Sequence, residues 1–318
     1  PASQDSVAGS PGASIAREVT HDDSVLPFAT PVSRTGSASA TFFTTDASDG
    51  GAYLFVSANQ AVDIFNRTGA LIAALADDDG PQGLAVDAVG NLYVADGARV
   101  LVYSKGYKDV PTSLFDPKEN PEGVAVDRKG NIGVTNIISN YGSGPGSVSF
   151  YTGPNSPVRR TISSSAFARI FFGAFDEAGN FFIDGENANR NAVVGEIVGG
   201  IKGNAITVLS TTDKIAIPGG ILVNTKDNLV VVDQRAEAAY TYLLKGTKLT
   251  RIATTPLTGT IDPVGIALAP NGTDIYAADA VNSAAYEFPY LRGGSPLQTI
   301  GIPGSQPIGI AIVPSANP

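Results

Sequence analysis

A sixteen-residue motif repeats along this chain and constrains its fold more than any other feature. It reads PQGLAVDAVGNLYVAD at residues 81–96 and returns as PEGVAVDRKGNIGVTN at residues 121–136. Four further units follow, the first of them degenerate and without the proline, beginning near Ala168 and at Pro218, Pro263 and Pro307. The units are spaced by roughly 40 to 50 residues, which is typical of four-stranded propeller blades.

Each unit predicts a series of short antiparallel strands. In the first complete copy, residues 83–87 form a short apolar run suited to a strand buried on both faces. Residues 88–91 supply a Gly-Asn turn that tolerates positive φ. Residues 92–96 and 100–104 predict the second and third strands, and Gly106 begins the link to an outer strand.

The two ends of the chain each carry an incomplete unit. Residues 52–75 align with the second, third and fourth strands, placing Leu54 on Leu92 and Phe65 on Tyr103, but lack a first strand. The last unit, beginning at Pro307, holds one strand and then stops. We therefore predict an all-β, six-bladed β-propeller, closed by the C-terminal strand Gly309–Val313 pairing with Leu54–Ser57 of the N-terminal blade.

The pattern P-x-G-[IVL]-A-V-D-x-x-G-N-[LI]-Y-V-A-D resembles the NHL repeat and, more distantly, the gluconolactonase/regucalcin-like propellers. The resemblance covers residues 50–318 and implies the propeller fold, although the unit near Ala168 departs from it. The absence of Trp excludes a WD-repeat propeller. A parallel β-helix is the alternative fold, but its repeats are shorter and would not leave complementary half-units at the two ends.

The extent of the repeat divides the chain into two segments, an N-terminal extended arm over residues 1–49 and the propeller over residues 50–318. The arm is rich in Ser, Ala, Thr and Gly and too poor in apolar residues to form a core of its own. We expect it to dock on its own ring or to mediate self-association with a second copy, and residues 40–47 are its strand candidate.

Composition excludes several classes of function. The net charge of −9 argues against nucleic acid as a partner, and no apolar run is long enough for a membrane-spanning segment. The chain has no Cys, which rules out disulfides and thiolate catalysis, and it begins at Pro1 without a Met. We predict an extracytoplasmic protein that is secreted, periplasmic or at the cell surface.

The residues needed for common catalytic sites are missing. The one histidine, His21, lies in the arm, so neither a Ser-His-Asp triad nor the catalytic His of streptogramin lyases is expected in the propeller. No catalytic residue is assigned. This favours a non-catalytic function and no cofactor, while leaving the question of an enzyme open.

The alternative function is a calcium-dependent, lactonase-type hydrolase with a metal at the tunnel mouth. Its oxygen ligands would be Glu122, which is similar in position to metal-binding residues of gluconolactonase-like enzymes, and the residues that close the second strands, Asp96, Asn136, Asp233 and Asp279. The competing interpretation is that these acids cap their own turns, because turn chemistry repeats whereas a single site does not. Two of the positions equivalent to Glu122 hold apolar residues, Val264 and Ile308. They favour a sealed tunnel with Glu122 facing solvent.

Two segments interrupt the repeat and indicate a binding face. Residues 137–147 and 185–192 predict long second-to-third-strand loops in adjacent blades, and insertions on one face of a repeat protein often mark its binding side. A protein, peptide or glycan would contact Tyr141, Glu186, Asn187, Asn189 and Arg190, with Glu122 nearby. We therefore predict a non-catalytic, exported binding or assembly module that uses its loop face and its arm.

Overall fold

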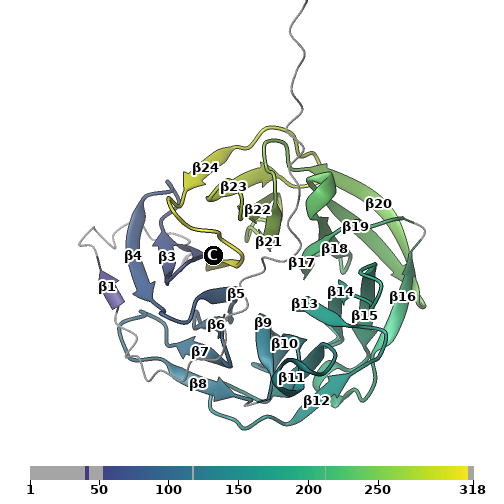
Figure 1. Ribbon diagram of the computed structural model, residues 1–318. Coiled ribbons are helices and arrows are strands. Elements are labelled where there is room, and N and C mark those ends of the chain that lie inside the picture. Colours follow the sequence, from purple (N-terminus) through teal and green to yellow (C-terminus); the bar gives the residue numbers. More distant parts are fainter. Residues whose placement is uncertain (1–39, 43–52, 117, 212, 314–318) are drawn as a thin grey trace, which may run out of the picture. The chain divides into compact units, whose positions relative to one another are not determined.

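The computed structural model describes residues 40–42, 53–116, 118–211 and 213–313 of this all-β chain. Hydrogen bonds group the described strands into five sheets, and Figure 1 shows them arranged around a common centre as a β-propeller. The predicted all-β propeller is therefore confirmed. The strand at or after the Pro-x-Gly motif, and its counterpart in the degenerate unit, lies innermost, and the other strands of each unit lie progressively further out.

The strands of three sheets follow the predicted order. The first of these sheets contains β5 (Pro81–Val86), β6 (Leu92–Asp96), β7 (Arg99–Tyr103) and β8 (Thr112–Phe115). The second contains β9 (Asn120–Val126), β10 (Ile132–Ile138), β11 (Ser147–Tyr151) and β12 (Arg160–Ser163), and the third β21 (Pro263–Leu268), β22 (Asp274–Asp279), β23 (Ala284–Pro289) and β24 (Gln298–Gly301). Each is a four-stranded antiparallel meander.

The fourth sheet is larger, because two units share it. Its eight strands are, in spatial order, β13 (Arg169–Phe175), β14 (Phe181–Glu186), β15 (Ala192–Ile197), β16 (Thr207–Thr211), β20 (Lys248–Pro256), β19 (Ala238–Lys245), β18 (Leu229–Asp233) and β17 (Pro218–Val223). The outer strands β16 and β20 join in parallel through the pairs Ser210↔Lys248 and Thr211↔Leu249. The expected six separate sheets are thus five hydrogen-bonded ones, since β20 is long enough to reach the neighbouring outer edge.

The fifth sheet joins the two ends of the described chain. It contains, from the centre outward, β25 (Ile310–Val313), β2 (Tyr53–Ala58), β3 (Ala61–Phe65), β4 (Leu71–Ala76) and β1 (Ala40–Phe42). β25 pairs antiparallel with β2 in the register Leu54↔Ile312 and Val56↔Ile310, which confirms the predicted closure. Ser57 Oγ accepts hydrogen bonds from the backbone N–H groups of Ile308 (3.0 Å) and Gly309 (2.7 Å) at this junction.

The strand expected within residues 40–47 is present as β1. It pairs antiparallel with the outer strand β4 in the register Ala40↔Leu75 to Phe42↔Ala73. This part of the arm thus adds its backbone to a sheet edge within its own chain, as one of the two predicted modes of docking requires. The remainder of the arm, residues 1–39 and 43–49, lies outside the described residues, as does His21.

The Asp-x-x-Gly-Asn sequence after β5, β9 and β13 explains the first hairpin turn of these three units. Asp87 Oδ1 accepts the backbone N–H of Asn91 at 2.8 Å, and Asn91 Nδ2 donates to Asp87 Oδ2 at 2.8 Å. The same two bonds recur between Asp127 and Asn131. The intervening Gly90 has φ +95°, a conformation that glycine adopts without strain. These acids are therefore turn residues, as the sequence predicts.

A close contact between neighbouring strands explains why the glycine of the Pro-x-Gly motif recurs in the repeat. An added Cβ on Gly309 would lie 2.0 Å from the carbonyl oxygen of Gln82, and one on Gly265 would lie 2.2 Å from that of Ile308. The equivalent Gly83, Gly123 and Gly220 approach the carbonyl oxygens of Glu122, Phe171 and Val264, which would lie 2.6, 2.9 and 3.1 Å from an added Cβ. Neighbouring innermost strands therefore approach so closely that only glycine fits between them.

Gly309→Ala and Gly265→Ala should each destabilise the protein by about 3 kcal/mol, because a rigid backbone oxygen occupies the space of the new methyl group. The matched control is Gly301→Ala on β24, where an added Cβ meets nothing within 4 Å and the free energy of unfolding should change by less than about 0.5 kcal/mol. Urea unfolding measures all three variants. Equal stability of Gly309→Ala and Gly301→Ala would contradict the glycine contact.

Candidate functional site

The loop face of the propeller is the side formed by the second-to-third-strand loops and by the segments that enter the innermost strands. Its longest described loop of the former kind joins β10 to β11 and runs over residues 139–146. Within it, Asn140–Gly142 form the short 3-10 helix η2. The predicted insertion at residues 137–147 is therefore real, although β10 continues to Ile138.

Tyr141 lies at the tip of this loop in an unfavourable backbone conformation. Asn140, Tyr141 and Gly142 have φ of +49°, +55° and +89°, and the side chain of Tyr141 is 73% exposed. A bulky residue rarely adopts positive φ, and such strain persists only where surrounding contacts impose it. The Tyr141 N–H donates to the Lys118 carbonyl oxygen at 3.0 Å, and the Gly144 N–H donates to that of Ser139 at 3.0 Å.

A buried polar network fixes the segment on which this loop rests. Asn136 Nδ2 donates to the hydroxyls of Ser147 (3.0 Å) and Ser149 (3.1 Å). These hydroxyls in turn donate to the carboxylates of Glu119 and Asp116 respectively, the second at 2.8 Å. The carboxylates flank Lys118, whose carbonyl oxygen holds Tyr141. The network therefore fixes the segment that contains Lys118, and Lys118 in turn accepts the hydrogen bond from Tyr141.

The second predicted loop is shorter than the sequence indicates. Both ends of residues 185–192 belong to strands, because β14 extends to Glu186 and β15 begins at Ala192. Only residues 187–191 form the turn, in which Asn187 Oδ1 accepts the N–H groups of Asn189 (2.9 Å) and Asn191 (3.1 Å). The loop is therefore shorter than the predicted 185–192, although it remains longer than the equivalent connections at residues 97–98, 234–237 and 280–283. Asn189 and Arg190 are exposed on this turn.

Backbone hydrogen bonds bring the two segments together. The Gly146 N–H donates to the Ala168 carbonyl oxygen at 3.1 Å, and the Ala168 N–H donates to that of Glu186 at 2.7 Å. Ala168 therefore bridges the β10–β11 loop and the β14–β15 turn. The predicted binding residues Tyr141, Glu186, Asn187, Asn189 and Arg190 consequently belong to one connected part of the loop face.

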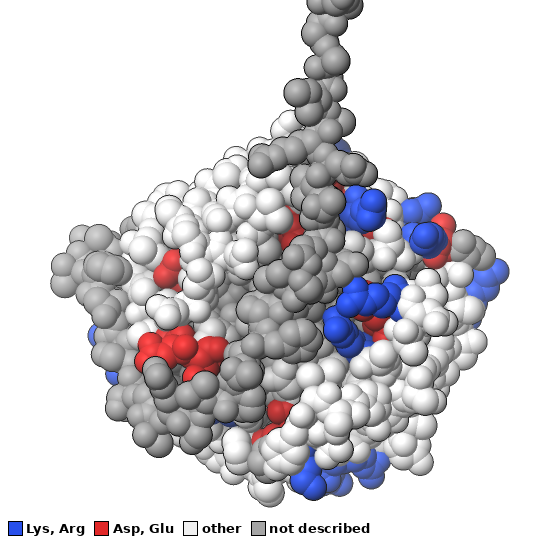
Figure 2. Space-filling view, in the orientation of Figure 1, with Lys and Arg blue, Asp and Glu red and all other residues white. Residues whose placement is uncertain are grey.

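Glu122 lies beside this region, near the tunnel. Its side chain is partly buried, which raises its pKa to about 7, and the nearby positive charge of Arg169 partly offsets this rise. The structure thus differs from the expectation that Glu122 faces solvent, because Glu122 is half-buried and close enough to Arg169 to feel its charge. Figure 2 shows Lys and Arg next to Asp and Glu over β13 and β14.

The acids that close two of the second strands cap backbone segments. Asp233 accepts the N–H groups of Ala216 (2.9 Å) and Ile217 (3.3 Å), just before β17. Asp279 likewise accepts those of Ile261 (2.7 Å) and Asp262 (3.2 Å), just before β21. Both side chains are buried, and their oxygens already satisfy backbone donors. Asp233 and Asp279 therefore cap backbone segments, which is the competing interpretation given for them from the sequence.

Asp96 departs from this pattern and takes part in an acidic cluster before β5. Its Oδ2 accepts from Arg99 Nε at 2.9 Å, and Arg99 Nη2 also contacts Asp79 at 3.1 Å. Asp77 and Asp96 are buried, and Asp77 Oδ2 and Asp96 Oδ1 have no hydrogen-bond partner in the described structure other than each other's carboxyl group. Burial and the Asp96 charge raise the pKa of Asp77 to about 8, so the two carboxyls share a proton at neutral pH. Figure 2 shows acidic side chains gathered over β5 and β6.

The predicted calcium ligands are not assembled into one site. Among the described residues, no group of three or more His, Cys, Asp or Glu side chains is placed to hold a metal ion. Asp233 and Asp279 bind backbone N–H groups, Asn136 binds two serine hydroxyls, and Asp96 binds Arg99. Glu122 is the one member of the set that lies beside Arg169 at the tunnel.

Sequence reasoning missed the polar network under the long loop and the role of Asp77. The network has a visible signal, because Ser147 and Ser149 alternate along β11 and must point to the same face of the sheet. Asp77 begins an Asp-Asp-Asp-Gly run that reads as a solvated turn, and only the fold buries it against Asp96.

The fold is shared with several solved structures. No protein-family model matches the sequence, and no curated protein matches it either. A structure of the nidogen/laminin complex matches at 18% identity and TM-score 0.68, covering 83% of this chain and 99% of that one. Virginiamycin B lyase from Staphylococcus aureus matches at 14% identity and TM-score 0.57, covering 86% and 92%. A protein of unknown function from Bacteroides caccae matches at 11% identity and TM-score 0.62, covering 83% and 99%.

These similarities confirm the propeller recognised from the repeat, and at such identities they concern the fold alone. A further Staphylococcus aureus lyase structure carries Ala in place of a His and is described as catalytically inactive. In the part of the chain that the structure describes, no helix has the length and apolar character needed to span a membrane.

The Asp77–Asp96 pair should make stability fall as pH rises from about 5 to about 8. The folded protein keeps the Asp77 proton up to a pKa of about 8, whereas the unfolded chain releases it near pH 4. Asp77→Asn keeps the hydrogen bonds without the titration, so its free energy of unfolding should decline less over this range, by on the order of 1–2 kcal/mol. Urea unfolding at several pH values measures this.

The matched control is Asp78→Asn, which alters the exposed neighbour of Asp77 and should follow the parent curve. Parallel pH profiles for the parent and Asp77→Asn would show that the pair shares no proton.

Proposed function

We propose that this chain is a non-catalytic binding module that captures a partner on its loop face. The observation that carries this proposal is Tyr141, an exposed aromatic side chain at positive φ whose N–H donates to the carbonyl oxygen of Lys118, between the two carboxylates of a buried polar network. A chain gains no stability from such an arrangement, and strained, over-determined residues cluster at functional sites. Aromatic side chains also dominate the energetics of protein interfaces.

The expected partner is a protein or peptide, with a glycan as a further candidate. Tyr141 would supply apolar contact area, while Glu186, Asn187, Asn189 and Arg190 would form a polar rim beside it. The nidogen/laminin structure, which matches in fold, is that of a propeller protein in a complex with another protein. No nucleic acid is proposed, because the net charge is −9.

The setting of this module is also part of the proposal. We infer an exported protein that is secreted, periplasmic or at the cell surface, on the basis of its lack of Cys and its Ser- and Ala-rich N-terminal segment. Self-association through the arm is a second mode of assembly, in which an extended segment of the arm would add to a strand edge of a second copy.

The ring is best counted as six repeating units. The eight-stranded sheet contains two innermost strands, β13 and β17, and each is followed by three antiparallel strands of its own. The parallel contact between β16 and β20 then joins two blades at their outer edges. Six innermost strands, including β25, agree with the six units of the sequence repeat.

A specific observation favours a second candidate, a hydrolase centred on Glu122. A carboxyl group whose pKa is about 7 is suited to general acid–base chemistry at neutral pH. Calcium would be the cofactor of such a lactonase-type enzyme. Against it, the chain has one His in all, in the arm, and the oxygens of Asp233 and Asp279 are taken up by backbone N–H groups.

Tyr141→Gly tests the binding function. Glycine accepts positive φ, so the free energy of unfolding should stay within about 1 kcal/mol of the parent. Affinity for a partner captured by the parent protein should fall at least tenfold, because the aromatic contact is lost. The control is Val110→Ala, which removes an apolar side chain that is 77% exposed outside the loop face. Full affinity of Tyr141→Gly would overturn the proposal.

Glu122→Gln tests the second candidate. If the protein is a lactonase, this isosteric change should lower kcat on a γ-lactone by at least 100-fold, with or without added calcium, and abolish any dependence of the rate on a group with pKa near 7. If the protein is a binding module, the parent shows no such activity and the variant retains its partner. A calcium-dependent activity present only in the parent would reverse our choice.

A further inference from the structure

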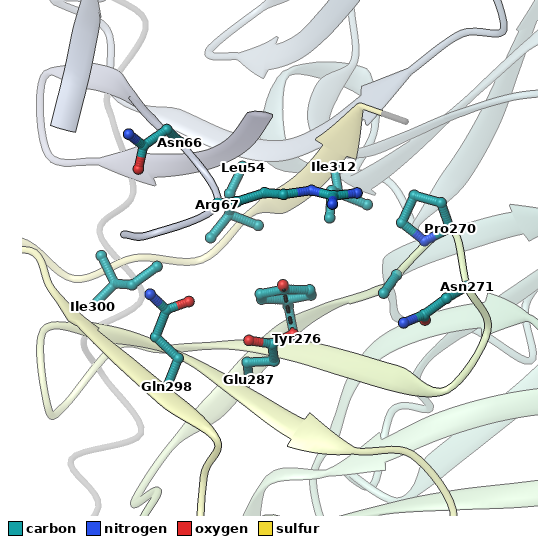
Figure 3. A pocket seen from close by; sticks show the side chains of 11 residues that line it. Leu54, Asn66, Arg67, Pro270, Asn271, Tyr276, Glu287, Gln298, Ile300 and Ile312 are labelled. Atoms are coloured by element: carbon teal, nitrogen blue, oxygen red, sulfur yellow. Dashed lines mark hydrogen bonds between the residues drawn. The ribbon is translucent and has the colours of Figure 1, made fainter. Parts of the chain in front are cut away.

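A cavity lies on the face opposite the loop face. It lies between the sheet that joins the two ends of the described chain (β1–β4 and β25) and the sheet of β21–β24. It has a volume of about 230 Å³ and is reached by the β3–β4 turn and the β21–β22 turn. Figure 3 shows Arg67 on one side of it, and Tyr276 and Glu287 on the other. The walls beside them are apolar and include Leu54, Ile300 and Ile312.

The neighbouring seam shows why this space is open. Tyr290 OH fills the corresponding position between the sheets of β17–β20 and β21–β24, where it bonds to Asn224 Nδ2 (3.0 Å) and Thr241 Oγ1 (3.0 Å). The register pairs Leu54↔Phe65 and Ile275↔Phe288 are equivalent in the repeat. Counting two residues onward from Phe65 and Phe288 makes Arg67 the counterpart of Tyr290.

The other two members of that polar contact are replaced as well. The pairs Val230↔Thr241 and Tyr276↔Glu287 are equivalent, so Glu287 stands where Thr241 stands. Ala269 likewise begins its hairpin turn at the position of Asn224. Where the neighbouring seam has a tyrosine contact, this seam therefore has a cavity with one cation, one anion and a small residue.

The two charges face the cavity without neutralising each other. In the described structure Arg67 has neither a hydrogen bond nor an ion pair, and its side chain is exposed. Glu287 Oε1 accepts from Tyr276 OH at 2.7 Å, which orients the carboxylate and leaves Oε2 available. Separated, oppositely charged groups that converge on a partly apolar pocket are the pattern of a site for a small ligand.

The backbone holding Arg67 is fixed in advance. Asn66 Oδ1 accepts the N–H groups of Thr68 (3.0 Å) and Ala70 (3.0 Å), which closes the β3–β4 turn around Arg67. Gly69 has φ +77°, and an added Cβ there would lie 2.7 Å from Gln298 Nε2, so the turn packs directly against β24. Pre-organisation of this kind reduces the entropy lost on binding.

We propose that this cavity binds a small zwitterion, an aliphatic L-amino acid. The planar guanidinium of Arg67 would take the α-carboxylate in a bidentate contact, and Glu287 would take the ammonium group. Leu54, Ile300 and Ile312 would contact the aliphatic side chain. The site is independent of the proposed loop-face function, because it lies at the other end of the strands.

Isothermal titration calorimetry with L-leucine tests this proposal. The parent should bind with a Kd of about 1 mM or tighter. Two probes dissect the contacts, since 4-methylpentanoate lacks the ammonium group and 3-methylbutylamine lacks the carboxylate. Each should bind at least tenfold more weakly than L-leucine, as should L-leucine itself to Arg67→Gln and Glu287→Gln.

The matched control is Arg292→Gln, an exposed arginine on the β23–β24 loop that does not line the cavity, which should bind like the parent. Tyr141→Gly should also bind L-leucine normally, so failure at one site is distinguishable from failure at the other. Absence of binding by the parent at about 10 mM L-leucine overturns the proposal, as does equal binding by Arg67→Gln or tight binding of the amine alone.

Discussion

The close backbone approach of neighbouring innermost strands is the contact on which the rest of the propeller depends. Each motif glycine faces a carbonyl oxygen of the next unit, from Gly309 against Gln82 to Gly265 against Ile308. This spacing sets the diameter of the centre, which is lined by small and apolar residues such as Leu84 and Ile266. A side chain at any of these positions would force the blades apart and open the apolar layers between them.

Most of the fold could be predicted because its determinants are local and recur. The Asp-x-x-Gly-Asn turn closes by bonds within five residues, and this turn fixes the register of the hairpin that it connects. Ring closure was also visible, since the missing strand at one end matches the extra strand at the other. The join between β16 and β20 was not, because it depends on the length of an outer hairpin that the repeat leaves free.

The candidate site was predicted less well, for a physical reason. The length of the segment between the second and third strands identified the β10–β11 insertion. The conformation of Tyr141, however, depends on a hydrogen bond to Lys118, which lies more than twenty residues earlier in the sequence. The bounds of the β14–β15 loop were predicted too widely, because the polar residues at its ends belong to strands that the Asx-turn of Asn187 connects. The burial of Asp77 and Glu122 comes from neighbouring units, and no local pattern reports it.

Function in this propeller is best sought where two neighbouring seams use equivalent positions differently. At the β17–β20 seam, Tyr290 joins two blades by bonding Asn224 and Thr241. At the next seam, Arg67 and Glu287 occupy the equivalent positions, and neither satisfies the other. Replacing a stabilising plug with two separated charges costs packing and gains no ion pair. Such a loss of packing between two sheets is tolerated most readily where the cavity that it opens binds a ligand.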